Sequence, residues 1–389
     1  MNSQKYGVTF LANTKPEQSI QTSSPLIWLH MNGIEVEIET SCLAFLFFKV
    51  RFLKENNLIL LSCKTKYLKP KIFVTRLLPK EAMDRIHSLF DATVWEGELP
   101  PSRSVLLESV KDADGLLCLL TDKIDAELMD GASKLRVISN LAVGYDNIDI
   151  REATNRKIIV TNTPGILTET TADYAFALIL AAARRILEGD QAVREGRWKT
   201  WDPTLLLGQD VHHSTLGIVG LGRIGYALAK RAKGFDMKVM YYNPSRNEKA
   251  ERELGIEYAT LEKLLAASDF ISIHADLNKQ TFHLISKDEF QIMKKDCILV
   301  NTARGPIVDN LALYEALKDE KIAGAALDVT EQEPIPPDDP LLKLKNIIIT
   351  PHIASASVAT RNNMANLAVE NLRIGLEGRV PAFAVNPKS

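Results

Sequence analysis

One glycine-rich segment constrains the fold of this 389-residue chain more than any other feature. Residues 215–225 read Thr-Leu-Gly-Ile-Val-Gly-Leu-Gly-Arg-Ile-Gly and carry the spacing GxGxxG at Gly220, Gly222 and Gly225. The motif lies in a strand–helix–strand pattern, whose predicted segments are residues 216–219, 223–234 and 238–242. A GxGxxG in this context predicts a βαβ unit that binds the pyrophosphate of a dinucleotide.

Each glycine of the motif has a physical task in such a unit. Gly220 permits the tight turn, Gly222 lets the backbone approach the pyrophosphate, and Gly225 lets helix and strand pack closely. The amides at the helix N-terminus then bind phosphate, helped by the helix dipole. No Gly-Lys-Ser/Thr closes the motif, which excludes a kinase-type phosphate loop. The residues expected to contact the cofactor here are Gly220, Leu221, Gly222, Arg223, Ile224 and Gly225.

Short apolar runs alternate with helical patterns on both sides of this unit, which predicts an α/β fold with parallel sheets. Before the unit, strands are predicted near residues 72–74, 116–120, 135–138 and 158–160, with helices near 80–90 and 125–129. From the unit onward, strands are predicted at residues 216–219, 238–242, 270–273, 297–301, 323–327 and 346–350, with helices near 223–234, 261–267, 287–294 and 309–319. A long apolar helix from Thr171 to about Leu187 stands between the two series.

Residues 1–68 differ from the rest of the chain. Their first part is polar and aperiodic, and residues 41–63 are apolar but interrupted by charged residues. A hairpin from Ile34–Ile38 and Leu58–Leu61 is one reading of this segment. The simpler interpretation, which we adopt, is a poorly ordered extension without a role in chemistry.

Composition excludes several classes of protein. The formal net charge is −2, so no overall charge favours nucleic acid or an anionic membrane. No apolar run reaches the roughly 18–20 residues of a membrane span. The first residues lack the order of a signal peptide, and the four cysteines form no CxxC pair. We therefore expect a cytoplasmic protein with no structural metal, in which Cys118 and Cys297 are buried thiols.

Three late strands run into unusual polar residues at their carboxyl ends. These are Arg304 after residues 297–301, Asp328, Glu331 and Glu333 after 323–327, and His352 after 346–350. Ligands of doubly wound sheets bind at that edge. An arginine fork can hold a carboxylate, a histidine can exchange a proton, and a carboxylate can orient the histidine.

Other interpretations of these residues were weighed. Arg304 could be a solvated loop residue and His352 a structural histidine if each stood alone. A zinc site fits less well, because no second histidine or cysteine lies near. The remaining histidines lack this combination of strand end and partners; they are His30, His87, His212, His213, His274 and His283.

The end of the second strand of the βαβ unit points to the kind of dinucleotide. An NAD-binding unit places Asp or Glu about 20 residues beyond the glycine motif, to bond the ribose hydroxyls. Here that place holds the neutral Asn243, and Pro244, Ser245 and Arg246 follow. A hydroxyl and a guanidinium, with no carboxylate between them, favour a 2′-phosphate and thus NADP(H) over NAD(H). The alternative is that Arg246 points into solvent and both cofactors are accepted.

These residues resemble the D-isomer-specific 2-hydroxyacid dehydrogenases, and within them the glyoxylate/hydroxypyruvate reductases. The likeness covers about residues 70–389 and is carried by the segments 140–149, 163–165, 198–203, 217–225, 300–309, 324–329 and 350–353. It implies two Rossmann-like or flavodoxin-like domains flanking a cleft. The coenzyme domain (169–355) would be inserted into a discontinuous substrate domain (69–168 and 356–389).

The resemblance also implies roles. Arg304 would bind the carboxylate and carbonyl oxygen of a small 2-oxoacid, His352 would be the acid/base, and Glu333, rather than Glu331, its partner. Backbone amides around Val143 and Gly144 would hold the substrate, and Trp201 would reach the partner's active site in a homodimer. The remaining residues expected on the cofactor are Thr302, Ala303, Asp328 and Ala354, together with Arg304 and His352. Other dehydrogenases of the family, and a dinucleotide-sensing corepressor, are the alternatives.

We expect the N-terminal extension to be dispensable, because nothing in it supplies a group that the proposed chemistry lacks. Deleting residues 1–66 should leave kcat/KM for glyoxylate within a few-fold of the full chain. Insolubility or a large loss in a steady-state assay would show instead that the extension packs on the catalytic part.

Overall fold

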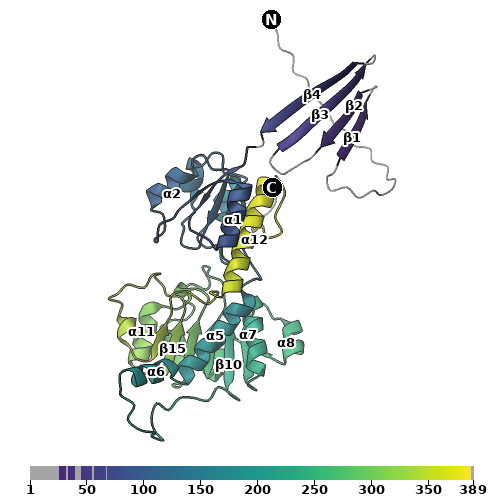
Figure 1. Ribbon diagram of the computed structural model, residues 1–389. Helices are drawn as coiled ribbons and strands as arrows, with labels where there is room; N and C mark the ends of the chain where they lie inside the picture. The colour runs from purple at the N-terminus through teal and green to yellow at the C-terminus, as the bar shows by residue number, and fades with distance from the viewer. Residues whose placement is uncertain (1–25, 32–33, 40–44, 55–56, 67, 387–389) are drawn as a thin grey trace. The chain divides into compact units, whose positions relative to one another are not determined.

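The computed structural model (Figure 1) describes residues 26–31, 34–39, 45–54, 57–66 and 68–386. The chain forms two units, Met1–Lys69 and Pro70–Ser389.

The N-terminal unit contains an antiparallel sheet in the order β1-β2-β3-β4. Its strands are β1 (Leu26–Met31), β2 (Ile34–Glu39), β3 (Phe45–Lys54) and β4 (Asn57–Lys66). This sheet was not predicted from the sequence, and the expectation that the extension has no role in the chemistry stays a prediction. The hairpin pairing is wrong, since β3 lies between β2 and β4 and pairs with both. Ladder hydrogen bonds are made by the backbone, so the charges at positions 49, 51 and 54 do not end β3.

The first sheet of the larger unit is parallel, in the flavodoxin-like order β6-β5-β7-β8-β9. Its strands are β5 (Lys71–Val74), β6 (Asp91–Val94), β7 (Gly115–Cys118), β8 (Val137–Asn140) and β9 (Ile159–Thr161). The helices between them are α1 (Lys80–Leu89), α2 (Arg103–Val110), α3 (Ala126–Gly131) and α4 (Ile150–Asn155). The last helix, α12 (Val358–Leu376), returns to this sheet and packs on α1 and β8, as Figure 1 shows in yellow.

The second sheet is also parallel, in the order β12-β11-β10-β13-β14-β15-β16. Its strands are β10 (Thr215–Val219), β11 (Lys238–Tyr242), β12 (Glu257–Tyr258), β13 (Phe270–Ile273), β14 (Ile298–Asn301), β15 (Gly324–Leu327) and β16 (Ile347–Ile349). Its helices are α5 (Thr168–Ala183), α6 (Ile186–Arg194), α7 (Arg223–Lys233), α8 (Glu248–Leu254), α9 (Leu261–Ala267), α10 (Lys287–Ile292) and α11 (Asn310–Lys318), with short 3₁₀ turns at Gly305–Ile307 and Pro340–Lys343. The strand order reverses between β10 and β13, where a doubly wound sheet binds its ligand.

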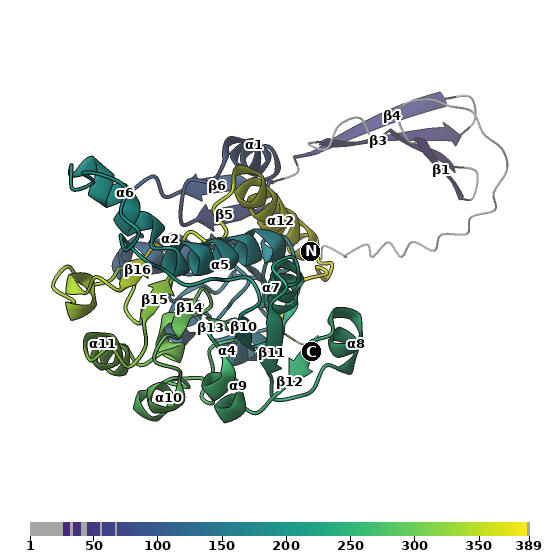
Figure 2. The same cartoon turned by 90° about the horizontal axis from the view of Figure 1, so that it is seen from below.

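Both sheets are covered on two faces, as the continuous apolar runs predict. In β14, Ile298 and Val300 join α5 and α7 in one core, whereas Leu299 packs with α9, α10 and α11 on the other face. Figure 2 shows α5 beside α7 on the first of these faces. Cys118 and Cys297 are buried free thiols, as expected. The α/β fold class with parallel sheets is confirmed.

The predicted long helix is wrong in its extent. It ends at Ala183, and Arg185 adopts a left-handed φ of 51° before α6 begins. The carbonyl of Ala183 accepts a hydrogen bond from the distant Gln209 amide (2.8 Å) instead of one from the next helical turn. The strand β6, the two-residue β12 and the helices α2, α4, α6, α8 and α12 were not predicted from the sequence.

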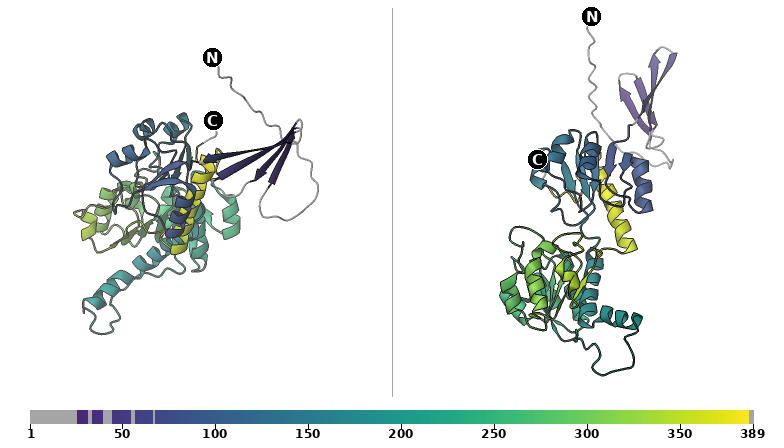
Figure 3. Two further views of the ribbon diagram at one scale, coloured as in Figure 1. Left: turned by 45° about the horizontal axis from the view of Figure 1, so that its top comes forward. Right: turned by 90° about the vertical axis from the view of Figure 1, so that its left-hand side faces the viewer.

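The segment that follows α5 leaves the body of the unit, as the teal ribbon in Figure 3 shows. No helix in the described part of the chain is long and apolar enough to cross a membrane. The domain boundaries at 168/169 and 355/356 stay a prediction, although α12 packs on the first sheet and α5 on the second.

Candidate active site

The glycine loop has the geometry of a phosphate cradle. Gly220 follows β10 with φ of 98°, and a side chain there would collide with the backbone of His274 and Ala275. A Cβ at Gly225 would collide with the Gly220 carbonyl, so the start of α7 packs closely on the turn. At Gly222, by contrast, a Cβ would meet no atom within 4 Å, which leaves room beside the backbone.

The N-terminus of α7 suits an anion. Its N-cap is Gly222, which has no side chain to cap the first amides, and its first turn carries no acidic residue. At the carboxyl end of β14, the Thr302 hydroxyl oxygen is buried and has no hydrogen-bond partner among the described residues. Open space, uncapped amides and an unpaired buried hydroxyl therefore fit a bound dinucleotide.

The end of β11 differs from expectation. Asn243 turns back to the glycine loop, where its Oδ1 accepts a hydrogen bond from the Leu221 amide (2.9 Å). Arg246 donates from Nε and Nη2 to the Glu251 carboxylate at 2.6–3.0 Å. The expectation that no carboxylate stands here is wrong, because α8 brings Glu251 onto the guanidinium. Pro244 and Ser245 are exposed.

A buried carboxylate fixes the loop that carries His352. Asp328 is 1% exposed, and its Oδ1 accepts from the Thr350 hydroxyl (2.7 Å) and the Ile353 amide (2.8 Å). Its Oδ2 accepts from the Ala354 amide (2.7 Å), and its own carbonyl accepts from the His352 amide (2.9 Å). His352 thereby keeps a left-handed φ of 55°, which costs a non-glycine residue about 1–2 kcal/mol.

The structure brings His352 and Glu333 together. His352 Nδ1 lies 2.7 Å from Glu333 Oε2, and the histidine side chain is 26% exposed. Glu333 Oε1 accepts a second bond from the Thr330 amide (3.2 Å), which holds the carboxylate in place. With Nδ1 donating to Glu333, the imidazole Nε2 is the nitrogen left for a substrate.

Arg304 and Gly144 are also brought together, although they belong to different sheets. A Cβ on Gly144 would collide with the Arg304 guanidinium at Nη2. Arg304 Nε donates to Asp146 Oδ1 (3.0 Å), and Nη1 donates to the Ala303 carbonyl (2.9 Å). The guanidinium thus lies against Gly144 in the loop after β8, in which Val143 immediately precedes Gly144.

Trp201 is not brought to this cluster by a contact within the described residues. It lies in the connection after α6, and its side chain is 78% exposed.

Sequence reasoning missed four partners of the site. Asp146 pairs with Arg304, which is distant in the sequence, and Glu251 pairs with Arg246 from a separate helix. No local sequence pattern connects either pair. His274 follows β13 and contacts the Ser272 hydroxyl at 2.9 Å, and burial lowers the pKa of His274 to about 4. His283 contacts Glu331 at 2.9 Å, so Glu331 has a partner of its own beside the Glu333–His352 pair.

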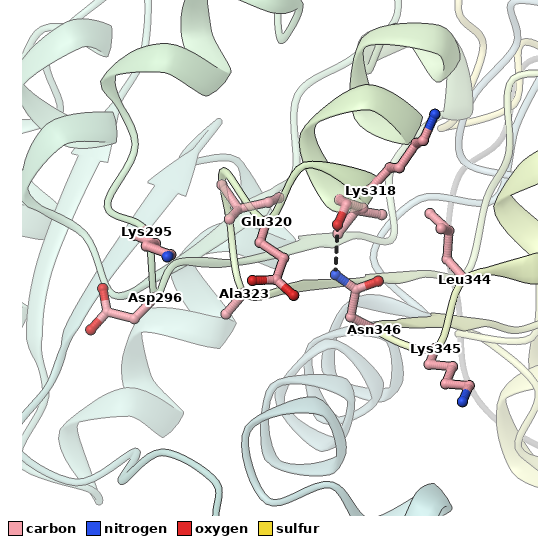
Figure 4. A pocket seen from close by; sticks show the side chains of 10 residues that line it. Lys295, Asp296, Lys318, Glu320, Ala323, Leu344, Lys345 and Asn346 are labelled. Carbon is pink, nitrogen blue, oxygen red and sulfur yellow. Dashed lines mark hydrogen bonds between the residues drawn. The ribbon is translucent and has the colours of Figure 1, made fainter.

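A surface cavity lies at the opposite edge of the same sheet (Figure 4). Residues at the amino ends of β14, β15 and β16 line it, among them Asp296, Ala323 and Asn346. Asn346 donates to the Leu317 carbonyl (3.1 Å) across it. Because the sheet is parallel, this cavity is separate from the edge that carries Gly220, Arg304 and His352.

Comparison with known proteins identifies the family. Residues 176–354 match the NAD binding domain of the D-isomer specific 2-hydroxyacid dehydrogenases. The chain is 56% identical to the glyoxylate reductase of Korarchaeum cryptofilum over 320 residues, which cover 82% of this chain and 96% of that protein. The chain belongs to the D-isomer-specific 2-hydroxyacid dehydrogenase family.

Solved structures of the family are similar over the same region. The TT0316 protein of Thermus thermophilus is 46% identical with a TM-score of 0.77, over 81% of this chain and 99% of that one. The NADPH-dependent glyoxylate/hydroxypyruvate reductase of Sinorhizobium meliloti, in complex with NADP and malonate, is 33% identical with a TM-score of 0.71. That likeness covers 82% of this chain and 97% of the other.

Proposed function

We propose that this dehydrogenase reduces a small 2-oxoacid, glyoxylate or hydroxypyruvate, to the D-2-hydroxyacid with a nicotinamide dinucleotide. The Glu333–His352 pair carries the proposal, because it sets a proton donor at the same sheet edge as Arg304 and the glycine loop. The high identity to curated glyoxylate reductases supports the substrate class.

Arg304 and the loop after β8 would bind the substrate between the two sheets. The amides around Val143 and Gly144 would hold the carboxylate, and Arg304 Nη2, which lies against Gly144, would reach the carbonyl oxygen. Asp146 restrains the guanidinium through Nε, so little side-chain freedom is lost when substrate binds. The positive charge of Arg304 would stabilise the negative charge that develops on the oxygen.

His352 would supply the proton. When bound, the reduced nicotinamide provides the hydride for the carbonyl carbon. His352 would donate a proton from Nε2 to the carbonyl oxygen. Its Nδ1–H would stay hydrogen-bonded to the Glu333 carboxylate, whose charge balances the imidazolium before transfer. Residues 220–225 would hold the pyrophosphate, and Thr302, Ala303, Asp328 and Ala354 remain proposed neighbours of the cofactor.

We further propose that NADP(H) is preferred and NAD(H) accepted. The neutral Asn243 supports this, since it removes the carboxylate that would repel a 2′-phosphate at the end of β11. Ser245 and Arg246 remain the proposed phosphate ligands, although Arg246 is shared with Glu251.

Replacing His352 by Ala should lower kcat about 10²- to 10⁴-fold, the usual contribution of a general acid. The fold should survive, because the side chain is partly exposed and contacts Glu333 at the surface of the loop. Steady-state reduction of glyoxylate, with thermal unfolding as the control, makes the measurement. Near-wild-type turnover would contradict the proposed role.

Two glutamates of one loop provide a matched pair for the same assay. Glu333→Gln should lower kcat/KM at least tenfold, because it removes the charge that stabilises the imidazolium. Glu331→Gln changes the same group two residues away, where the partners are His283 and the Asn310 amide, and should stay within a few-fold of wild type. Equal effects of the two changes would argue against the proposed pair.

We also propose a homodimer built on α6 and the connection after it. Large apolar side chains along this segment are about half or more exposed; they include Ile186, Leu187, Val193, Trp198, Trp201 and Leu207. Such a run marks an interaction surface, and a partner there could bring Trp201 to the site. Light scattering at micromolar concentration should give twice the chain mass, and a monomeric mass would refute the dimer.

A further inference from the structure

Glu251, a carboxylate that was not predicted from the sequence, forms an ion pair with Arg246, the arginine proposed to bind the 2′-phosphate. Its Oε1 accepts a hydrogen bond from Arg246 Nε, and its Oε2 accepts one from Arg246 Nη2. The Nη2–Oε2 distance, 2.6 Å, is the shortest of this forked ion pair. Among the described residues, the hydrogen bonds recorded for the Arg246 side chain all go to this carboxylate. Any phosphate at Arg246 thus meets a guanidinium already paired with an anion.

Glu251 is the fixed member of the pair. Its side chain is 14% exposed, whereas that of Arg246 is 59% exposed. The hydroxyl of Tyr241, a fully buried residue of β11, donates to Glu251 Oε1 (2.7 Å) and accepts from the Asn247 amide (2.7 Å). The carboxylate is thereby anchored to the sheet, and Arg246 is drawn to it.

Glu251 is charged under all working conditions. The hydrogen bonds from Arg246 and Tyr241 lower the pKa of its carboxyl to about 2. A 2′-phosphate at Arg246 must therefore share the guanidinium with a full negative charge beside it. NADH, which carries hydroxyls at that position, meets no such competition.

We propose that Glu251 is a specificity-determining residue, which limits the preference for the 2′-phosphorylated cofactor by competing for Arg246. This inference rests on the proposed function only for the identity of the cofactor pair. The carboxylate would keep the enzyme able to use both dinucleotides. Without it, the freed guanidinium would favour NADPH more strongly.

The test is nucleotide binding to the full chain without substrate. Dissociation constants for NADPH and NADH come from the fluorescence of the reduced nicotinamide, and those for 2′,5′-ADP and 5′-AMP from calorimetry. Glu251→Gln should tighten NADPH and 2′,5′-ADP by about threefold to tenfold, because one negative charge beside the phosphate is removed. NADH and 5′-AMP should change by less than twofold. Unchanged or weaker binding of 2′,5′-ADP would overturn the proposal.

Two further variants assign the effect to Arg246. Glu253→Gln removes the same charge from the same helix. Its partners are the Tyr226 hydroxyl (2.8 Å) and Lys249 (3.7 Å) rather than Arg246, so the change should leave all four constants unchanged. An equal gain in Glu253→Gln would mean a general charge effect and overturn the assignment. In an Arg246→Ala background, the gain from Glu251→Gln should be largely lost, and a full gain there would also overturn it.

The outcome is separable from that of the proposed function. Glyoxylate reduction by the wild type tests the reaction, whereas 2′,5′-ADP and 5′-AMP carry no nicotinamide and report only on the ribose site. If Glu251 affects the binding of these fragments but the chain reduces no 2-oxoacid, the inference about Glu251 stands and the proposed reaction is wrong. If the chain reduces a 2-oxoacid but fragment binding does not depend on Glu251, the proposed reaction stands and the inference about Glu251 is wrong.

Discussion

The candidate site depends on one buried carboxylate. Asp328 stands at the carboxyl end of β15 and uses both oxygens to hold the loop after β16, through Thr350, Ile353 and Ala354. These charge-assisted bonds offset the free-energy cost of the left-handed backbone conformation at His352. Without them, the loop would relax to a less strained conformation. The position of the His352 backbone follows from this anchoring, while the Glu333 carboxylate is held separately by the Thr330 amide (3.2 Å).

The second requirement is that the two sheets of the larger unit meet. Arg304 comes from β14 and lies on Gly144 and Asp146, which follow β8 of the other sheet. The α12 helix closes the chain back onto the first sheet, where the Ser139 hydroxyl donates to the Ala368 carbonyl (2.8 Å). The proposed carboxylate site thus uses residues from both sheets, whereas the proton donor and the dinucleotide loop belong to one.

Local signals were enough to predict much of this arrangement. The GxGxxG loop and the polar strand ends are encoded within a few residues, so the β10–α7–β11 unit and the positions of Arg304, Glu333 and His352 could be read directly. Partners supplied by other elements could not. Asp146 lies 158 positions from Arg304 in the sequence, and Glu251 comes from α8, which was not predicted. Similarly, α5 ends where the Gln209 amide donates a hydrogen bond to the Ala183 carbonyl. Strand β3 was missed because the charged positions 49, 51 and 54 were taken as interruptions of a backbone ladder.

Asp328→Asn tests most directly whether this buried carboxylate positions the proposed acid. The side-chain amide nitrogen of the asparagine would face an N–H or O–H donor of the His352 loop. One buried donor would then lack an acceptor, which costs about 1–3 kcal/mol of folding free energy. We expect kcat for glyoxylate at saturating NADPH to fall at least tenfold on the folded variant, with the Kd of NADPH followed separately by fluorescence. Unchanged kcat, or a loss confined to the Kd of NADPH, would contradict the account and assign Asp328 to the cofactor alone.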